Sequence, residues 1–183
     1  MDEKGLPETL PGFDHPLALL RACHTKILAH CDLLEQLIAD QGSTGKETEI
    51  RSTARQVMTY FSTSARLHHQ DEEIDLFPLL TRQSLKLADL VYALKQEHLE
   101  LDTLWQSIAA DLKQLQDVTD HAALADRVLA FCELNRRHIR RENMEFLPRA
   151  ESILSSQQLK DVGAAMAARR GVSYPGWPVR SEK

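Results

Sequence analysis

Two stretches of the chain, LHHQDEEIDLFP at residues 67–78 and HIRRENMEFLP at residues 138–148, carry the same chemical pattern. Each has a histidine ten residues before its proline and a glutamate four residues after that histidine. Positions i and i+4 lie one turn apart on the same face of an α-helix, so each pair can reach one ion. The pairs are His68 with Glu72 and His138 with Glu142.

Two further histidines occur in the same order along the chain. His24 and His98 lie among leucines at helical spacing, and each precedes an HxxxE pair, by 44 and 40 residues respectively. The chain therefore divides into two helical hairpins, each with one histidine and one HxxxE pair. Hairpins that face each other would bring four histidines and two carboxylates into the interior. The candidate metal ligands are His24, His68, Glu72, His98, His138 and Glu142.

This set of side chains indicates a metal centre with two ions. Imidazole and carboxylate together suit first-row transition ions, and a carboxylate can bridge two of them. An isolated ionised glutamate is costly to bury, so an inward-facing Glu72 or Glu142 needs a cation or an equivalent partner. Six protein ligands exceed the four of a tetrahedral zinc site, whereas two irons with bridging carboxylates could use them all.

Apolar residues recur at helical spacing around these motifs, and polar or glycine-containing breaks separate the helical stretches. We expect helices from about 14 to a break at 41–45, then over about 46–78, 84–116, 121–154 and 156–169. The second helix should end or kink near Phe77-Pro78, because proline removes a backbone donor and clashes one turn back. Long helices with short links favour antiparallel neighbours. The expected fold class is all-α, an up-down-up-down four-helix bundle with a short additional C-terminal helix.

The expected organisation is an extended arm at residues 1–13, the bundle at 14–155, and a short helix with an irregular tail at 156–183. The formal net charge of −5 gives no electrostatic reason to expect nucleic acid as a partner. No run of about 18 apolar residues is present, so no membrane partner is expected. Three cysteines without a CxxC pair favour reduced thiols in a cytoplasmic protein.

The second helix offers an alternative register for its ligands. His69 and Glu73 have the same i, i+4 spacing as His68 and Glu72. The alignment of the two prolines favours His68 and Glu72. His69 and Glu73 then flank the site and could hydrogen-bond a ligand imidazole.

Two other carboxylates are weaker ligand candidates. Asp102 lies four residues after His98, and Glu145 lies three residues after Glu142. A polar helix face is the preferred interpretation of both. The remaining histidines are interpreted as surface or structural residues, namely His15, His30 and His121.

With these motifs in order, the chain resembles a bacterial branch of the hemerythrin-like, or HHE cation-binding, family. The residues that carry the resemblance are His24, the HHQDEE run at 68–73, Glu97-His98 and the HxxxE pair at 138–142, within about residues 12–171. The resemblance implies a non-haem di-iron site that binds dioxygen or a related small ligand between helices. The histidines would be terminal ligands, and Glu72 and Glu142 would bridge.

One position departs from the family pattern. Oxygen-carrying hemerythrins have five histidine ligands, including an HxxxH pair on the third helix, but here the residue four before His98 is Leu94. The missing histidine could leave a coordination position open to water or another small ligand. This departure favours sensing or redox chemistry over reversible oxygen carriage.

We therefore expect a protein that binds two iron ions and, through them, dioxygen or a related ligand, for sensing, storage or iron handling. The alternative is a redox enzyme or iron-repair factor that acts on peroxide or nitric oxide at the same site. Steady-state turnover would distinguish the two. A metal-free helical interaction domain is a second alternative. No nucleophile or phosphate-binding loop accompanies the motif, which favours a binding protein over an enzyme. The sequence is also compatible with a homodimer.

Overall fold

The computed structural model describes residues 11–41, 43–115 and 118–173. Within these ranges every regular element is a helix and no strand is present, which confirms the all-α prediction. The first half contains α1 (Pro16–Ala39), α2 (Glu47–Tyr60), η1 (Phe61–Ala65), α3 (Arg66–Gln70), η2 (Asp71–Leu76) and α4 (Phe77–Gln83). The second half contains η3 (Leu85–Leu87), α5 (Ala88–Lys113), α6 (His121–Arg141), η5 (Glu142–Phe146), α7 (Leu147–Ile153) and α8 (Ser156–Arg169).

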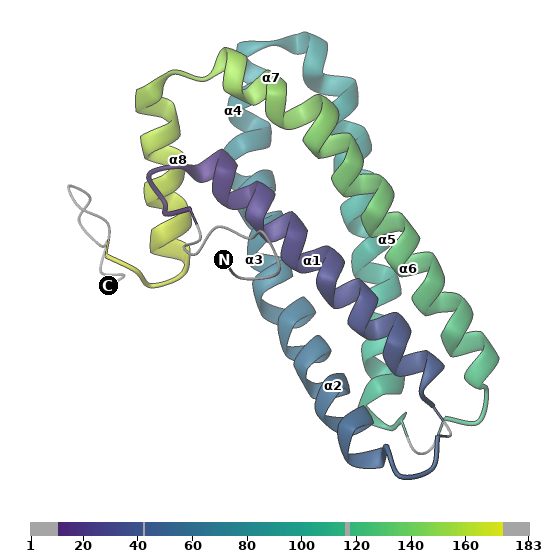
Figure 1. Cartoon of the computed structure of the whole chain (residues 1–183). Helices are drawn as coiled ribbons and strands as arrows, with labels where there is room; N and C mark the ends of the chain where they lie inside the picture. Colours follow the sequence, from purple (N-terminus) through teal and green to yellow (C-terminus); the bar gives the residue numbers. More distant parts are fainter. Residues whose placement is uncertain (1–10, 42, 116–117, 174–183) are drawn as a thin grey trace, which may run out of the picture.

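The long helices lie alongside one another in a bundle (Figure 1). Helix α1 contacts α2 and α6, and α5 contacts α6 and α2. The shorter α8 packs against α1 and η2. Most of the arm predicted at residues 1–13 and the end of the predicted tail lie outside the described residues. No helix of the described part is long and apolar enough to span a bilayer.

Local sequence signals set where several helices begin. Pro16 opens α1, where its fixed φ suits the first helical turn. The carboxylate of Asp120 accepts a hydrogen bond from the backbone N–H of Ala123 and caps α6. Ser155 and Gln158 form a reciprocal capping box at the start of α8. These contacts satisfy backbone donors that would otherwise lack partners at a helix start.

The chain stays helical through Pro78, although the sequence pattern predicts an end or a kink there. Helix α4 continues to Gln83, and the turn just before it, η2, is a π-helix. A π-helix has i to i+5 hydrogen bonds and is wider than an α-helix. The same order recurs in the second half, where the π-helix η5 precedes Pro148 in α7. The wider turn therefore accommodates the missing proline N–H without ending the helix.

Two apolar clusters fill the bundle and leave a polar layer between them. One cluster includes Ile27, Leu101 and Phe131, and the other includes Leu20 and Leu94, all buried. Burying one such side chain stabilises the fold by about 2 kcal/mol. In each long segment, a candidate ligand lies between a residue of one cluster and a residue of the other. The packing thus shields the polar layer from water on both sides.

Candidate metal centre

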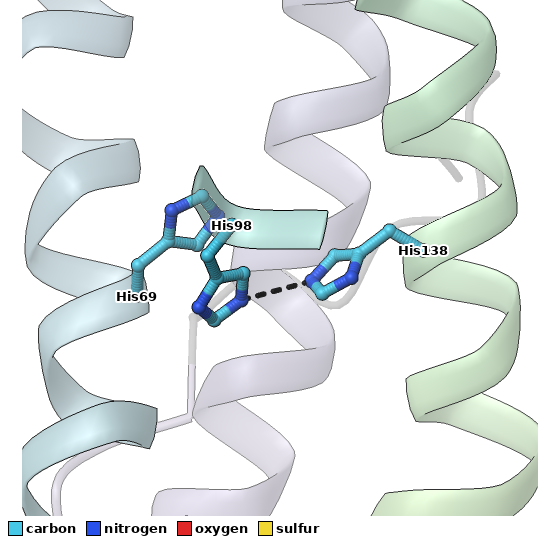
Figure 2. A group of neighbouring side chains, drawn as sticks. All are labelled: His69, His98 and His138. Atoms are coloured by element: carbon cyan, nitrogen blue, oxygen red, sulfur yellow. Dashed lines mark hydrogen bonds between the residues drawn. The ribbon is translucent and has the colours of Figure 1, made fainter. Parts of the chain in front are cut away.

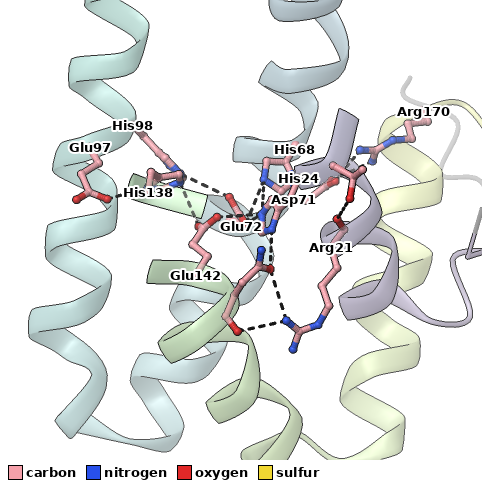
Figure 3. Close-up of polar contacts among 12 residues, drawn as sticks. Arg21, His24, His68, Asp71, Glu72, Glu97, His98, His138, Glu142 and Arg170 are labelled. Atoms are coloured by element: carbon pink, nitrogen blue, oxygen red, sulfur yellow. Dashed lines mark hydrogen bonds and ion pairs between the residues drawn. The ribbon is translucent and has the colours of Figure 1, made fainter. Parts of the chain in front are cut away.

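The six residues singled out in the sequence lie together in this polar layer (Figure 3). Each comes from a helix of the bundle and points toward the others. Their exposed fractions are 1% for His24, 1% for His68, 0% for Glu72, 3% for His98, 1% for His138 and 0% for Glu142. The six side chains therefore do converge in the interior, as expected for two hairpins that face each other.

The six residues form two overlapping groups of potential ligands. The first group is His24, His68, Glu72 and Glu142, and the second is Glu72, His98, His138 and Glu142. In each group, one nitrogen or oxygen of every residue lies within 4.8 Å of the corresponding atoms of the others. Both carboxylates belong to both groups, so each lies between two pairs of histidines.

The histidine nitrogens within each group lie close to one another. Nε2 of His24 is 3.1 Å from Nε2 of His68, and Nε2 of His98 is 3.1 Å from Nε2 of His138. Two nitrogens at about 2.1 Å from one ion, at a right angle to each other, are separated by about 3 Å. Each pair of imidazoles is therefore spaced as two neighbouring ligands of one ion.

The comparisons with known proteins agree with this arrangement. The family model of the hemerythrin HHE cation binding domain matches residues 15–150. The chain belongs to this family. An uncharacterized protein of Haemophilus influenzae is 30% identical over 171 residues, which cover 91% of this chain and 96% of the relative. The resemblance to an HHE family protein of a bacterial branch is thus confirmed.

Three of the four histidines in the polar layer have an oxygen acceptor at Nδ1. The pairs are His24 Nδ1 with Asn143 Oδ1 at 2.9 Å, His98 Nδ1 with Glu73 Oε1 at 2.7 Å, and His138 Nδ1 with Glu97 Oε2 at 2.8 Å. An oxygen acceptor at Nδ1 holds the proton on that nitrogen. The Nε2 atom of each of these rings then faces the centre of the polar layer and can bind an ion once it carries no proton.

The resulting arrangement fits divalent cations. The lone pairs of His98 and His138 at 3.1 Å repel each other unless a cation or a proton lies between them. Within the described residues, no well-oriented hydrogen bond reaches any carboxylate oxygen of Glu72 or Glu142. The nearest imidazole nitrogens lie 3.0 to 4.0 Å from these oxygens. Buried polar atoms without partners are costly, and metal ions would satisfy both the nitrogens and the oxygens.

The two carboxylates have opposite pKa shifts in the metal-free protein. Burial, followed by the charge of Glu142, raises the pKa of Glu72 well above its usual range. Burial also opposes ionisation of Glu142, but His138 and His24 outweigh it and hold its pKa well below the usual range. Burial lowers the pKa of the neutral His68. In the metal-free centre these effects favour the protonated form of Glu72 and the ionised form of Glu142.

His69, the register alternative, lies beside His98. The two rings are stacked, with centroids 3.9 Å apart and planes at 13° (Figure 2). One ring nitrogen of each of His69, His98 and His138 also lies within 4.8 Å of the others. Glu73 accepts the Nδ1–H of His98, as expected for a residue that flanks the site and orients a ligand.

A narrow pocket of about 20 Å³ reaches His69 from the surface. Its other lining residues include Ala65, Trp105 and Asn135. This volume holds about one water molecule. A larger hollow of about 320 Å³ lies beside Leu112 and does not include any of the buried histidines.

The weaker ligand candidates lie outside both groups. Asp102 and Glu145 are exposed. Leu94, where the HxxxH pattern would place a histidine, is fully buried in an apolar cluster. The other histidines are also apart from the centre: His15 and His121 are exposed, and His30 stacks on Tyr60 with centroids 3.6 Å apart.

Sequence reasoning missed two residues that orient ligands, Glu97 and Asn143. Asn143 follows His138 by five residues, just as Glu73 follows His68, so the aligned repeat contained a signal for it. Glu97 adjoins His98 but hydrogen-bonds His138 on another helix, which only the packing of α5 against α6 reveals.

A buried ion cluster ties α8 to the site. The carboxylate of Asp71, which is 0% exposed, pairs with the guanidinium groups of Arg169 and Arg170. Arg169 also pairs with Asp75 at 2.7 Å. Asp71 immediately precedes Glu72, so the last turn of α8 braces the turn that carries this candidate ligand.

Proposed function

We propose that this protein holds two iron ions in its polar layer and, through them, binds dioxygen or a related small ligand. The observation that carries the proposal is the pair of ligand groups that share Glu72 and Glu142. A shared carboxylate between two nitrogen pairs suits two neighbouring transition ions better than one. The proposed ligands are His24, His68, Glu72, His98, His138 and Glu142.

Each proposed ligand has a stated role. The four histidines would be terminal ligands, and Glu72 and Glu142, which belong to both groups, would bridge the two ions. The hydrogen bonds at Nδ1 hold the rings in place, which limits the reorganisation that binding requires. Iron would supply reversible electron transfer and open coordination for a small ligand. The apolar clusters exclude bulk water from that position.

The size of the pocket beside His69 supports a small ligand. A volume of about 20 Å³, enough for about one water molecule, is in keeping with a very small ligand and excludes an organic substrate. The position of Leu94 supports the same conclusion, because an apolar side chain there leaves the second group one nitrogen ligand short of the HxxxH pattern. We therefore favour sensing, storage or iron handling over turnover of an organic substrate.

The proposal includes the remaining features expected from the sequence. We propose that residues 14–155 form the metal-binding bundle with up-down-up-down topology, and that 156–183 are an appended segment. The free thiols of Cys23, Cys31 and Cys132 are in keeping with the cytoplasm as its compartment. Nothing in the chain's charge calls for nucleic acid.

The test is the iron content of the full chain after anaerobic reconstitution with ferrous iron. We expect about two irons per chain in the wild type, and charge-transfer absorption that changes when azide or nitric oxide is added. His68→Ala and Glu142→Ala should lose at least one iron each. His121→Ala, which replaces an exposed histidine, is the matched control and should keep both. A wild-type chain that remains folded and iron-free would refute the proposal.

A further inference from the structure

The two hairpins hold each other's histidines by equivalent hydrogen bonds. Glu73 and Asn143 occupy the same place in the aligned repeat, five residues after His68 and His138. Each bonds to a histidine of the opposite hairpin: Glu73 to His98 at 2.7 Å, and Asn143 to His24 at 2.9 Å. The two halves of the centre therefore have the same arrangement, so the hydrogen-bond acceptors at equivalent positions can be compared directly.

The acceptors in the two halves differ in charge. In the half that contains His98 and His138, both Nδ1 atoms meet carboxylates, those of Glu73 and Glu97. In the half that contains His24 and His68, one Nδ1 meets the neutral amide of Asn143. Within the described residues, the Nδ1 of His68 has no hydrogen-bond partner. One half thus has two anionic acceptors, and the other has a single neutral one.

The surrounding charges do not remove this difference. Arg141 pairs with Glu97 at 2.7 Å, but the ion pair of Glu73 among the described residues is with the imidazole of His98 itself. Beside the other half, the guanidinium of Arg21 lies 3.5 Å from Asn143 Oδ1 and pairs with Glu151 at 3.0 Å. This ion pair has no net charge, and the amide has none, so that half has no anionic acceptor to match Glu73 and Glu97.

A carboxylate acceptor strengthens an imidazole as a metal ligand. It draws the Nδ1 proton toward itself and increases electron density at Nε2, and removing such a partner typically lowers metal affinity by about 10- to 100-fold. The negative charge also favours a nearby divalent cation directly. Both effects act on the nitrogens of His98 and His138, and neither acts on those of His24 and His68. The same carboxylates also favour a proton on His138, which the ion displaces when it binds.

We propose that the two metal positions are unequal: the position at His98 and His138 binds its ion more tightly and fills first. The position at His24 and His68 fills second. This inference rests on the proposed function, because it concerns the order in which the two ions bind. Glu73 and Glu97 are then positioning residues that set the affinity of one site, and Asn143 is the neutral counterpart that keeps the other site weaker.

The test is an anaerobic titration of the metal-free full chain with Co²⁺, whose visible absorption reports its coordination. We expect two binding phases with dissociation constants at least about tenfold apart. His98→Ala should remove the tight phase, whereas His24→Ala should leave the tight phase and remove the weak one. Competition with a chelator of known affinity gives both constants.

The matched pair of variants is Glu73→Gln and Asn143→Asp, which exchange the charge between equivalent positions. Glu73→Gln should weaken the tight phase by about tenfold and leave the weak phase unchanged. Asn143→Asp should strengthen the weak phase by a similar factor, a gain that misfolding cannot produce. Circular dichroism of each variant checks that the helices are intact.

The outcomes separate this inference from the proposed function. Two Co²⁺ ions that bind with equal constants, or a tight phase that His24→Ala removes, would overturn the inference and leave the two-metal centre standing. A chain that binds neither Co²⁺ nor Fe²⁺ would overturn both. Two phases that respond as described to Glu73→Gln and Asn143→Asp would support the inference.

Discussion

The pKa of His138 predicts how the stability of the metal-free protein depends on pH. Burial opposes protonation of this imidazole, but the charge of Glu142, 3.3 Å away, and the hydrogen bond to Glu97 outweigh it and raise the pKa to about 9. In the unfolded chain the ordinary value of 6.5 applies. The folded state therefore holds a proton that the unfolded state releases between these two values.

The sign and size of the effect follow from this difference. A raised pKa in the folded state stabilises the fold fully below pH 6.5, and this contribution is lost as pH rises toward 9. One pKa unit corresponds to about 1.4 kcal/mol, so His138 should account for a fall of about 3 kcal/mol across that range. Glu72, whose pKa burial raises, acts in the same direction because its proton is also lost on unfolding.

The assay is urea unfolding of the chelator-treated protein at several pH values between 6.5 and 9. The wild type should lose at least about 3 kcal/mol of unfolding free energy over this interval. In His138→Gln the loss should shrink by about that amount, while His121→Gln, a change at an exposed histidine, should behave as the wild type. A metal-free wild type that is equally stable or more stable at pH 9 would refute the reasoning.

Two further changes test contacts that α8 makes with other parts of the protein. Asp71→Ala leaves the guanidinium groups of Arg169 and Arg170 without their buried carboxylate, and should lower the unfolding free energy by about 3 kcal/mol in urea titrations. An unchanged urea midpoint would show that α8 does not depend on this cluster. Gly163→Ala would place a methyl group 1.8 Å from the carbonyl oxygen of Phe13, so it should cost about 1 to 3 kcal/mol and lower the midpoint of a thermal melt. A melt like that of the wild type would mean that the segment at Phe13 can move away freely.

The centre could be predicted from the sequence because its main signals are local. The i, i+4 spacing of His68 and Glu72, and its repetition at His138 and Glu142, needs only the periodicity of a helix. The preference for His68 over His69 rests on the alignment of the prolines, and it stays a prediction. Apolar spacing likewise predicts helices throughout the described residues.

The contacts around the centre could not be predicted because they join residues far apart in the chain. The bond between His24 and Asn143 spans 119 residues, and that between His138 and Glu97 spans 41. The rotation of each helix about its axis decides such pairs, and helical periodicity does not fix that rotation to within one residue. The bracing of Asp71 by α8 depends in the same way on where a short helix docks.

The wide turns η2 and η5 each take up one residue without changing which way the helix beyond them faces. A π-helical turn holds one residue more than an α-helical turn, so it is the form that a single inserted residue takes inside a helix. The same residues in a regular α-helix, without the wide turn, would rotate everything beyond 71–76 or 142–146 by about 100°. Leu76, Phe77, Phe146 and Leu147, now fully or almost fully buried, would then face in other directions. Relatives that keep this core should therefore either keep a wide turn at each place or have one residue fewer there, with a regular α-helix.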